Sequence, residues 1–293
     1  MQSIKNYLSL IKFSHSIFAL PFALIGFTIA FVDIKNKASI FTSNFIFQKL
    51  LLVIICMISA RSAAMAFNRF LDRNIDAKNP RTKIREIPSG IITPKNALIF
   101  TLISCFIFIV SCYFINHLAL ALAPVALFVI LFYSYTKRFT ALCHIVLGLG
   151  LSLAPIGAYI AVVGKFEILP ILFSFIVLFW VSGFDIIYAL QDEKFDKENN
   201  LQSIPALLGK KNALIVSRIL HFICAIIILI IGFQFINQFL FWMGAALFIG
   251  SLFYQQSIVS ANDLKKVNIA FMTTNGFASI VFAIFVITSL LLK

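Results

Sequence analysis

Nine long apolar runs divide the chain, and short polar segments separate them. The runs extend approximately over residues 14–32, 45–68, 96–115, 117–135, 141–163, 168–190, 212–236, 238–258 and 268–292. A helix needs roughly 20 apolar residues to cross a bilayer. The runs lack the polar alternation of barrel strands, and only helices or closed barrels satisfy their backbone hydrogen bonds in lipid. The pattern therefore predicts an all-α integral membrane protein with nine transmembrane helices.

Composition supports this prediction. Hydrophobic residues make up 61% of the 293 residues and charged residues 12%, against about 45–50% and about 25% in soluble domains. The first run is long enough to span and no small-residue cleavage site follows it, so we interpret it as a span rather than a cleaved signal peptide. We expect residues 1–293 to form a single polytopic domain.

The distribution of Lys and Arg predicts the orientation. With the N-terminus in the cytoplasm, 17 of the 24 basic residues lie in cytoplasmic segments, as the positive-inside rule requires. The loops 69–95 and 191–211 are then cytoplasmic, and we expect the inner membrane of a bacterium. The net charge of +13 suits an anionic leaflet and an anionic substrate. We do not interpret it as a sign of a nucleic-acid partner.

A weak internal repeat relates two parts of the chain. IPSGIITPKNAL, residues 87–98, and IPALLGKKNAL, residues 204–214, each follow an acidic stretch and lead into the next apolar run. Repeats of this kind are typical of membrane proteins built from two halves with a site between them. We therefore expect two pseudo-repeated halves.

Acidic residues are concentrated in two segments, which hold eight of the 11 in the chain. In the first, Asn68, Asp72 and Asp76 are spaced by four, which places them within about an 80° arc of a helix, with Arg61 on the same stripe. In the second, Asp185, Asp192 and Asp196 fall within about 40°, with Tyr188 adjacent. Each stripe is expected to continue a transmembrane helix across its cytoplasmic end.

Two facing carboxylate stripes would repel each other unless a cation lay between them. Mg²⁺ takes oxygen ligands, and it usually binds one or two carboxylates plus substrate phosphates. Basic residues nearby could bind the remaining diphosphate oxygens; they are Arg69, Arg73, Lys78, Arg81, Lys83, Arg85 and Lys194. Solvated helix-end charges that pair with one another are the competing interpretation. Two stripes on repeat-related helices favour a metal–diphosphate site.

These segments resemble the UbiA-type intramembrane prenyltransferases. RSAAMAFNRFLDRNIDAKNPRTKIREIPSG, which begins at Arg61, is similar to the first Asp-rich motif of that family, and GFDIIYALQDEKFDKENNLQSIP, which begins at Gly183, to the second. SYTKRFT, residues 134–140, is similar to a third segment. The resemblance implies a helical bundle with a central cavity and cytoplasmic cap loops, in which helices two and six carry the Asp motifs. It also implies Mg²⁺, a polyprenyl diphosphate and a small aromatic acceptor.

Two departures from the family pattern bear on the details. Arg69 follows Asn68 where many members have a second acid, so one expected carboxylate is a cation. The N-terminal segment KFSHSIFALPFALIG lacks the Asp-Lys-Pro pattern common in the 4-hydroxybenzoate enzymes of ubiquinone synthesis. Two acceptors stay open: a 4-hydroxybenzoate type, and a 1,4-dihydroxynaphthoate type for menaquinone.

The resemblance assigns expected roles. The metal ligands are Asp72, Asp76, Asp192 and Asp196; the substrate-binding residues are Arg61, Asn68, Arg81, Lys83, Tyr188 and Lys194; the catalytic residues are Asp72, Asp185 and Asp192. Asp185 positions the acceptor or takes its ring proton, while Arg61 pairs with an acceptor carboxylate or, alternatively, with Asp185. We interpret the four scattered histidines as structural. The lipid bilayer is an expected partner, and no oligomeric state is predicted.

A membrane transporter is the non-enzyme alternative. Transporters share internal repeats and intramembrane charge, but their charged sites lie near the middle of the bilayer. In this chain the carboxylates gather at one face instead, which favours the enzyme.

Overall fold

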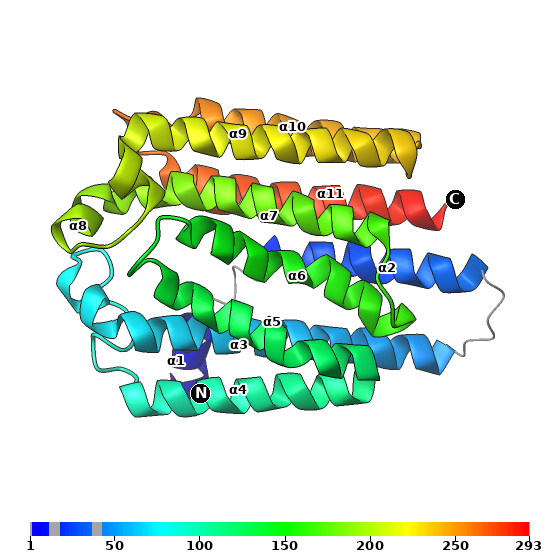
Figure 1. Cartoon of the computed structure of the whole chain (residues 1–293), viewed down its shortest axis with the longest axis horizontal. Helices are drawn as coiled ribbons and strands as arrows, with labels where there is room; N and C mark the ends of the chain where they lie inside the picture. The colour runs from blue at the N-terminus through cyan, green and yellow to red at the C-terminus, as the bar shows by residue number, and fades with distance from the viewer. Residues whose placement is uncertain (1, 12–17, 37–42, 293) are drawn as a thin grey trace.

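The chain is an antiparallel bundle of long helices (Figure 1). The computed structural model describes residues 2–11, 18–36 and 43–292, and within them the regular elements are all helical. The α-helices are α1 Gln2–Leu10, α2 Leu20–Asn36, α3 Ser43–Lys78, α4 Pro94–Ile115, α5 His117–Thr136, α6 Cys143–Val163, α7 Ile168–Ala189, α8 Glu193–Glu198, α9 Ile204–Gln234, α10 Phe239–Ser257 and α11 Asn275–Leu291. A 3₁₀ turn, η2 Leu190–Asp192, precedes α8, and a π-helical segment, η3 Ile269–Thr274, precedes α11. The prediction of an all-α protein is confirmed.

Eight helices of the described residues are long and apolar enough to cross a membrane. Large apolar side chains cover their outer faces, as expected of a surface that meets lipid; Phe106, Phe128, Phe233 and Phe253 are each more than 60% exposed. The predicted first run corresponds to α2, which is apolar but has 17 residues and begins at Leu20. Residues 14–17 of that predicted run lie outside the described part of the chain.

Aromatic packing fixes the half of the bundle built from α2, α7, α10 and α11. Phe22, Trp180, Phe248 and Phe282 are buried and have ring centroids 4.8–6.2 Å apart in successive pairs. The Trp180 indole donates a hydrogen bond of 2.8 Å to the side-chain oxygen of Asn275. Since a buried indole N–H needs an acceptor, this bond locks the start of α11 against α7.

Both halves of the internal repeat contain a left-handed glycine. Gly90 (φ 78°) ends the turn of IPSG before α4, and Gly209 (φ 75°) interrupts α9 inside IPALLG. Only glycine adopts such a φ without strain. Both segments of the repeat therefore use a glycine with positive φ where the chain is directed into the next long helix.

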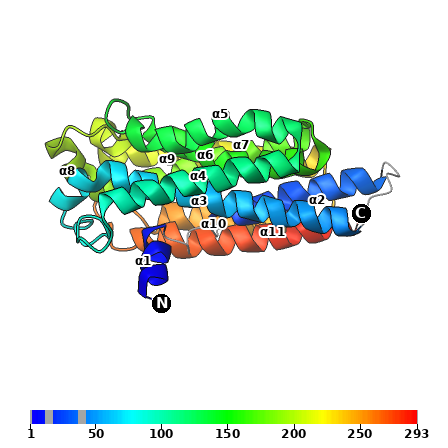
Figure 2. The same cartoon turned by 90° about the horizontal axis from the view of Figure 1, so that it is seen from below.

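The connections carrying most of the charge lie at one end of the bundle. Helix α8 and the loop 79–93 lie together at the left end of Figure 1, and α1 lies at the same end, across the bundle direction in Figure 2. Helix α3 has 36 residues and is about 54 Å long, longer than the roughly 30 Å of a bilayer core. Part of this helix therefore extends beyond the hydrocarbon layer of a bilayer that the bundle crosses.

Candidate active site

Helix α3 carries the whole first acidic stripe. It continues without a break through Lys78, so Asn68, Asp72 and Asp76 lie on one face, as predicted. Asp72 and Asp76 are 2% and 3% exposed. The Asn68 amide donates to Asp72 Oδ2 at 3.2 Å. This face points into the bundle end rather than into solvent.

The second acidic stripe does not lie on one helix, and that part of the prediction is wrong. Asp185 lies on α7, Asp192 ends the 3₁₀ turn η2, and Asp196 lies on α8. The helix tightens at its end, where the Leu190 N–H donates to the carbonyls of Ile187 and Tyr188. Such 3₁₀ turns are common at the ends of α-helices. All three acids nevertheless line the same cavity.

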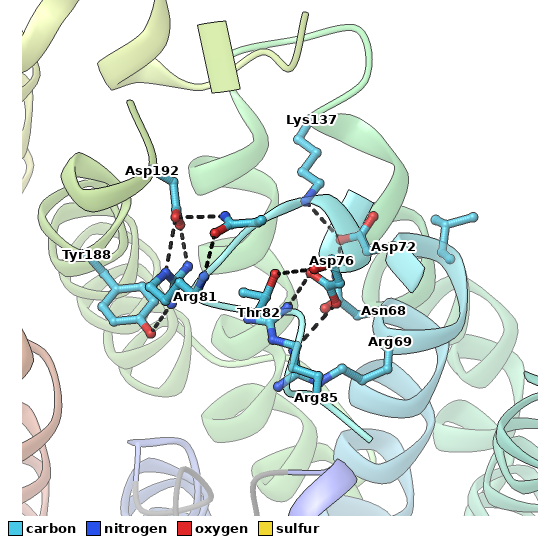
Figure 3. Close-up of polar contacts among 12 residues, drawn as sticks. Asn68, Arg69, Asp72, Asp76, Arg81, Thr82, Arg85, Lys137, Tyr188 and Asp192 are labelled. Atoms are coloured by element: carbon cyan, nitrogen blue, oxygen red, sulfur yellow. Dashed lines mark hydrogen bonds and ion pairs between the residues drawn. The ribbon is translucent and has the colours of Figure 1, made fainter. Parts of the chain in front are cut away.

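Basic side chains pair with the carboxylates of α3. Lys137 Nζ lies 2.9 Å from Asp72 Oδ2 (Figure 3). Arg138 Nη2 lies 2.9 Å from Asp72 Oδ1. Arg85 donates to Asp76 Oδ1 at 2.7 Å, while Arg69 is buried 4.0 Å from Oδ2. Arg69, the departure from the family motif, therefore adds a second cation beside Asp76. These pairs balance charge that could not otherwise be buried.

Arg81 joins the loop after α3 to the turn after α7. Its guanidinium binds both oxygens of Asp192, with Nε 3.1 Å from Oδ1, and its Nη1 donates to the Tyr188 hydroxyl at 2.8 Å (Figure 3). Burial lowers the pKa of Arg81, but hydrogen bonding to Asp192, its charge and Tyr188 outweigh burial and raise the pKa. The Tyr188 ring stacks on Phe271 at 4.1 Å. Arg81 thus ties the loop that follows the first acidic cluster to Asp192 of the second.

The acidic end encloses a polar cavity of about 320 Å³. A second cavity of about 320 Å³, lined mainly by apolar side chains of α3, α5 and α6, extends toward Ile115 and Phe166 at the other end of those helices. The two cavities share wall residues: Arg61, Met65, Tyr133, Leu147 and Leu151. An ionic chamber therefore adjoins an apolar one, with Arg61 at the junction.

Most of the predicted site residues meet at the polar cavity. The lining includes Arg61, Asn68, Asp72, Asp76, Arg81, Asp185, Tyr188, Asp192 and Asp196. Lys83 and Lys194 are not among the lining residues that the structure describes. Lys83 is exposed in the loop, and the Lys194 side chain is 88% exposed, 3.9 Å from Glu198. Both side chains are therefore exposed, and neither belongs to the cavity lining that the structure describes.

Sequence reasoning missed several partners of the acids. Lys137 and Arg138 lie in the SYTKRFT segment, so the resemblance of that segment was the available signal. His144 was interpreted as structural, yet its Nδ1 lies 2.7 Å from Asp185 Oδ2. Ser203, the N-cap of α9, donates to Asp196 at 2.8 Å. Ser203 lies within the second Asp-rich segment, seven residues after Asp196. No spacing along the chain connects His144 to Asp185, because the two lie 41 residues apart, on α6 and α7.

A membrane bundle with two acidic clusters beside an apolar cavity defines the class of intramembrane prenyltransferases. The chain belongs to the UbiA prenyltransferase family, whose model matches residues 19–281. It is therefore a membrane prenyltransferase.

Individual relatives agree with this assignment. The 4-hydroxybenzoate octaprenyltransferases of Tolumonas auensis and Aliivibrio fischeri strain MJ11 are each 28% identical to it, over 76% and 80% of this chain and 78% and 81% of their own. The apo structure of a UbiA homolog from Aeropyrum pernix K1 matches with a TM-score of 0.78 and 27% identity, over 95% of this chain and 97% of that one. A UbiA homolog from Archaeoglobus fulgidus bound to DMAPP and Mg²⁺ shares the fold at 20% identity and a TM-score of 0.74, over 98% and 100%.

Proposed function

We propose that this enzyme transfers a polyprenyl group from polyprenyl diphosphate to a ring carbon of a 4-hydroxybenzoate-type acceptor in quinone biosynthesis. The observation that carries the proposal is the junction of the ionic cavity with the apolar cavity at Arg61. A prenyl diphosphate has the matching shape, with a charged head and a long apolar tail. The names of the relatives favour 4-hydroxybenzoate over the 1,4-dihydroxynaphthoate alternative.

The donor set fits Mg²⁺ on the condition that the substrate completes the site. Within the described residues, no group of three or more His, Cys, Asp or Glu side chains is arranged to hold a metal alone. Asp76 Oδ2 is nevertheless buried without a hydrogen bond, beside the polar cavity. Mg²⁺ typically combines one or two carboxylates with substrate phosphates. We assign Asp72, Asp76, Asp192 and Asp196 as its ligands. A UbiA homolog of the same fold is bound to DMAPP and Mg²⁺, which supports the use of this metal.

The basic residues of the cavity bind the diphosphate. Arg81, Arg85 and Lys137 line the cavity and pair with its carboxylates. When metal and diphosphate enter, these cations exchange carboxylate oxygens for phosphate oxygens, to which guanidinium groups bind well. Asn68 and Tyr188 add polar contacts from the wall. Lys83 and Lys194, which are exposed, have no part in this scheme.

The reaction breaks the allylic C–O bond and forms a C–C bond to the acceptor ring. Mg²⁺ supplies charge neutralisation on the departing diphosphate. The apolar cavity holds the prenyl chain and keeps water from the allylic cation. The ring carbon attacks that cation, and Asp185 receives the proton that the ring then loses. Arg61, at the junction, pairs with the acceptor carboxylate, which directs the ring toward the cation.

Topology follows from the same scheme. We infer that α2 is the ninth span, because it is apolar and lies against α6 and α11 inside the bundle. The loop 79–93, α8 and the N-terminus then lie on the cytoplasmic side of a bacterial inner membrane, as the Lys and Arg distribution indicates. The two halves meet at the site. The position of the acids at one bundle end argues against a transporter, whose charges lie at mid-membrane.

Product analysis tests the proposal. Membranes containing the enzyme are incubated with Mg²⁺, one polyprenyl diphosphate and either 4-hydroxybenzoate or 1,4-dihydroxynaphthoate, and the lipid products are identified by mass spectrometry. We expect prenylated 4-hydroxybenzoate, absent from membranes with the Asp192→Asn variant. Prenylated naphthoate alone would refute the acceptor, and no product from either acceptor would refute the proposed reaction.

A further inference from the structure

A buried His144 and a partly buried Asp185 form a pair in the wall of the polar cavity. The imidazole Nδ1 lies 2.7 Å from Asp185 Oδ2. The His144 side chain is 4% exposed and that of Asp185 is 22% exposed. The carboxylate therefore keeps some access to the cavity, while the imidazole behind it is held by the protein.

The second ring nitrogen fixes the state of the imidazole. The backbone N–H of Ile204 points at His144 Nε2, 3.4 Å away. A backbone amide can only donate, so a neutral ring accepts at Nε2 and carries its proton on Nδ1, and a protonated ring carries a proton on Nδ1 as well. His144 consequently donates to Asp185. Such a contact to the far nitrogen is the usual way in which proteins set the tautomer of a histidine.

The donor to His144 comes from the first turn of α9. Ile204 is the first residue of that helix after the N-cap Ser203, so its N–H has no partner inside the helix. Ser203 also donates its hydroxyl to Asp196, at 2.8 Å. One helix start thus supports both Asp196 and, through His144, Asp185.

We propose that His144 is a positioning residue for the acceptor side of the reaction. It holds Asp185 Oδ2 by a hydrogen bond, so that Oδ1 is left for the acceptor hydroxyl or for the ring proton. The inference rests on the proposed function, in which Asp185 serves the acceptor. It assigns a part in catalysis to His144 on α6, which lies outside both acidic motifs.

Amide substitutions separate the two nitrogen positions. In His144→Asn the amide nitrogen occupies about the place of Nδ1 and can still donate to Asp185. In His144→Gln it reaches about the place of Nε2 instead, and His144→Leu has no donor. We expect His144→Leu and His144→Gln to raise the acceptor KM and lower kcat, together by about tenfold to a hundredfold in kcat/KM. The KM for prenyl diphosphate should change less than twofold, and His144→Asn should recover most of the activity.

His221→Leu is the matched control. His221 is also buried, and it bonds to the Trp180 carbonyl and to Gln256, but it does not line the polar cavity. We expect a lower melting temperature from this variant, with both KM values unchanged. Each variant is assayed at equal amounts of folded protein, measured by size-exclusion chromatography in detergent.

A double-mutant cycle completes the test. If His144 acts through Asp185, His144→Leu should add less than about twofold to the loss caused by Asp185→Asn, because coupled residues are not additive. Additive losses, or equal increases of both KM values in His144→Leu, would overturn the inference. Wild-type kinetics in His144→Leu would also overturn it while leaving the proposed function intact. A wild-type enzyme that makes no prenylated product from either acceptor would refute the proposed function and this inference together.

Discussion

The guanidinium of Arg81 binds both carboxylate oxygens of Asp192 and so connects the loop after α3 to the turn after α7. Asn79 in the same loop donates to Asp192 Oδ1 at 3.2 Å and fixes the start of the loop through the Arg81 N–H. The contact between Arg81 and Asp192 therefore joins two segments of the cavity wall. Substrate phosphates can replace Asp192 as the partner of the guanidinium. This relationship leads to the first prediction.

Arg81→Lys should weaken binding of prenyl diphosphate. Lysine keeps the charge but loses the two-pronged geometry for carboxylate and phosphate. The loss of a charged hydrogen bond suggests about 1.5–3 kcal/mol, so the KM for prenyl diphosphate should rise about tenfold or more. Initial rates at varied prenyl diphosphate check this. Lys95→Ala, exposed in the first turn of α4, is the control, and an unchanged KM in Arg81→Lys would remove Arg81 from the diphosphate site.

Asp72→Asn and Asp192→Asn should each lower kcat by about 10²-fold or more. Both changes keep side-chain size but remove a charge that binds the metal, where charge develops on the leaving diphosphate. Single-turnover assays with labelled prenyl diphosphate measure the effect. Asp263→Asn, an exposed acid in the loop before η3, should leave kcat unchanged. Wild-type turnover in both cavity variants would be inconsistent with the two-cluster site.

Chelation should abolish activity, and added Mg²⁺ should restore it. Mg²⁺ typically combines one or two carboxylates with substrate phosphates, so the metal is expected to bind together with the diphosphate. The rate is measured in excess EDTA and again after titration with Mg²⁺, with Ca²⁺ as the comparison ion. Full activity in excess EDTA would rule out metal-assisted departure of the diphosphate.

Arg61→Ala should raise the acceptor KM more than that for prenyl diphosphate. Removing the charged hydrogen bond to an acceptor carboxylate suggests about 1.5–3 kcal/mol. Varying each substrate in turn separates the two effects. A variant that weakens only prenyl diphosphate use would contradict the acceptor role. Failure of the protein to accumulate would favour the alternative in which Arg61 pairs with Asp185.

Cysteines introduced at Ile84 and Lys194 should be modified from the cytoplasmic side. Both positions are exposed at the acidic end of the bundle. A membrane-impermeant maleimide should label them in inverted vesicles and not in right-side-out spheroplasts, above the level of the parent protein. Labelling only from outside would reverse the orientation derived from the basic residues.

The helices and the first acidic cluster could be predicted because they depend on neighbours in the sequence. Apolar runs define membrane spans locally, and the spacing of four between Asn68, Asp72 and Asp76 already places them on one face of α3. The same reasoning was wrong after Ala189. A 3₁₀ turn changes the angular step there, and the pattern of charges along α7 and α8 gives no sign of it.

The partners of the acids depend on tertiary structure and could not be derived from spacing. Lys137 reaches Asp72 across 65 positions of the chain, and His144 reaches Asp185 across 41. Conversely, a basic residue close to an acid in sequence need not lie close to it in the site. Lys194 lies beside Asp192 along the chain, yet its side chain points to water. Sequence spacing therefore predicted which carboxylates line the cavity better than it predicted which basic residues pair with them.

The junction of the two cavities at Arg61 also has a consequence for product release. The chemistry creates one product that is fully charged and another that is a membrane lipid. Free diphosphate can leave through the polar end toward water, whereas the prenylated ring keeps its tail among the apolar walls of α3, α5 and α6. The two departures then occur in opposite directions and need not compete. A small aromatic solute is thereby converted into a molecule that partitions into the bilayer. This apolar product does not have to pass through water.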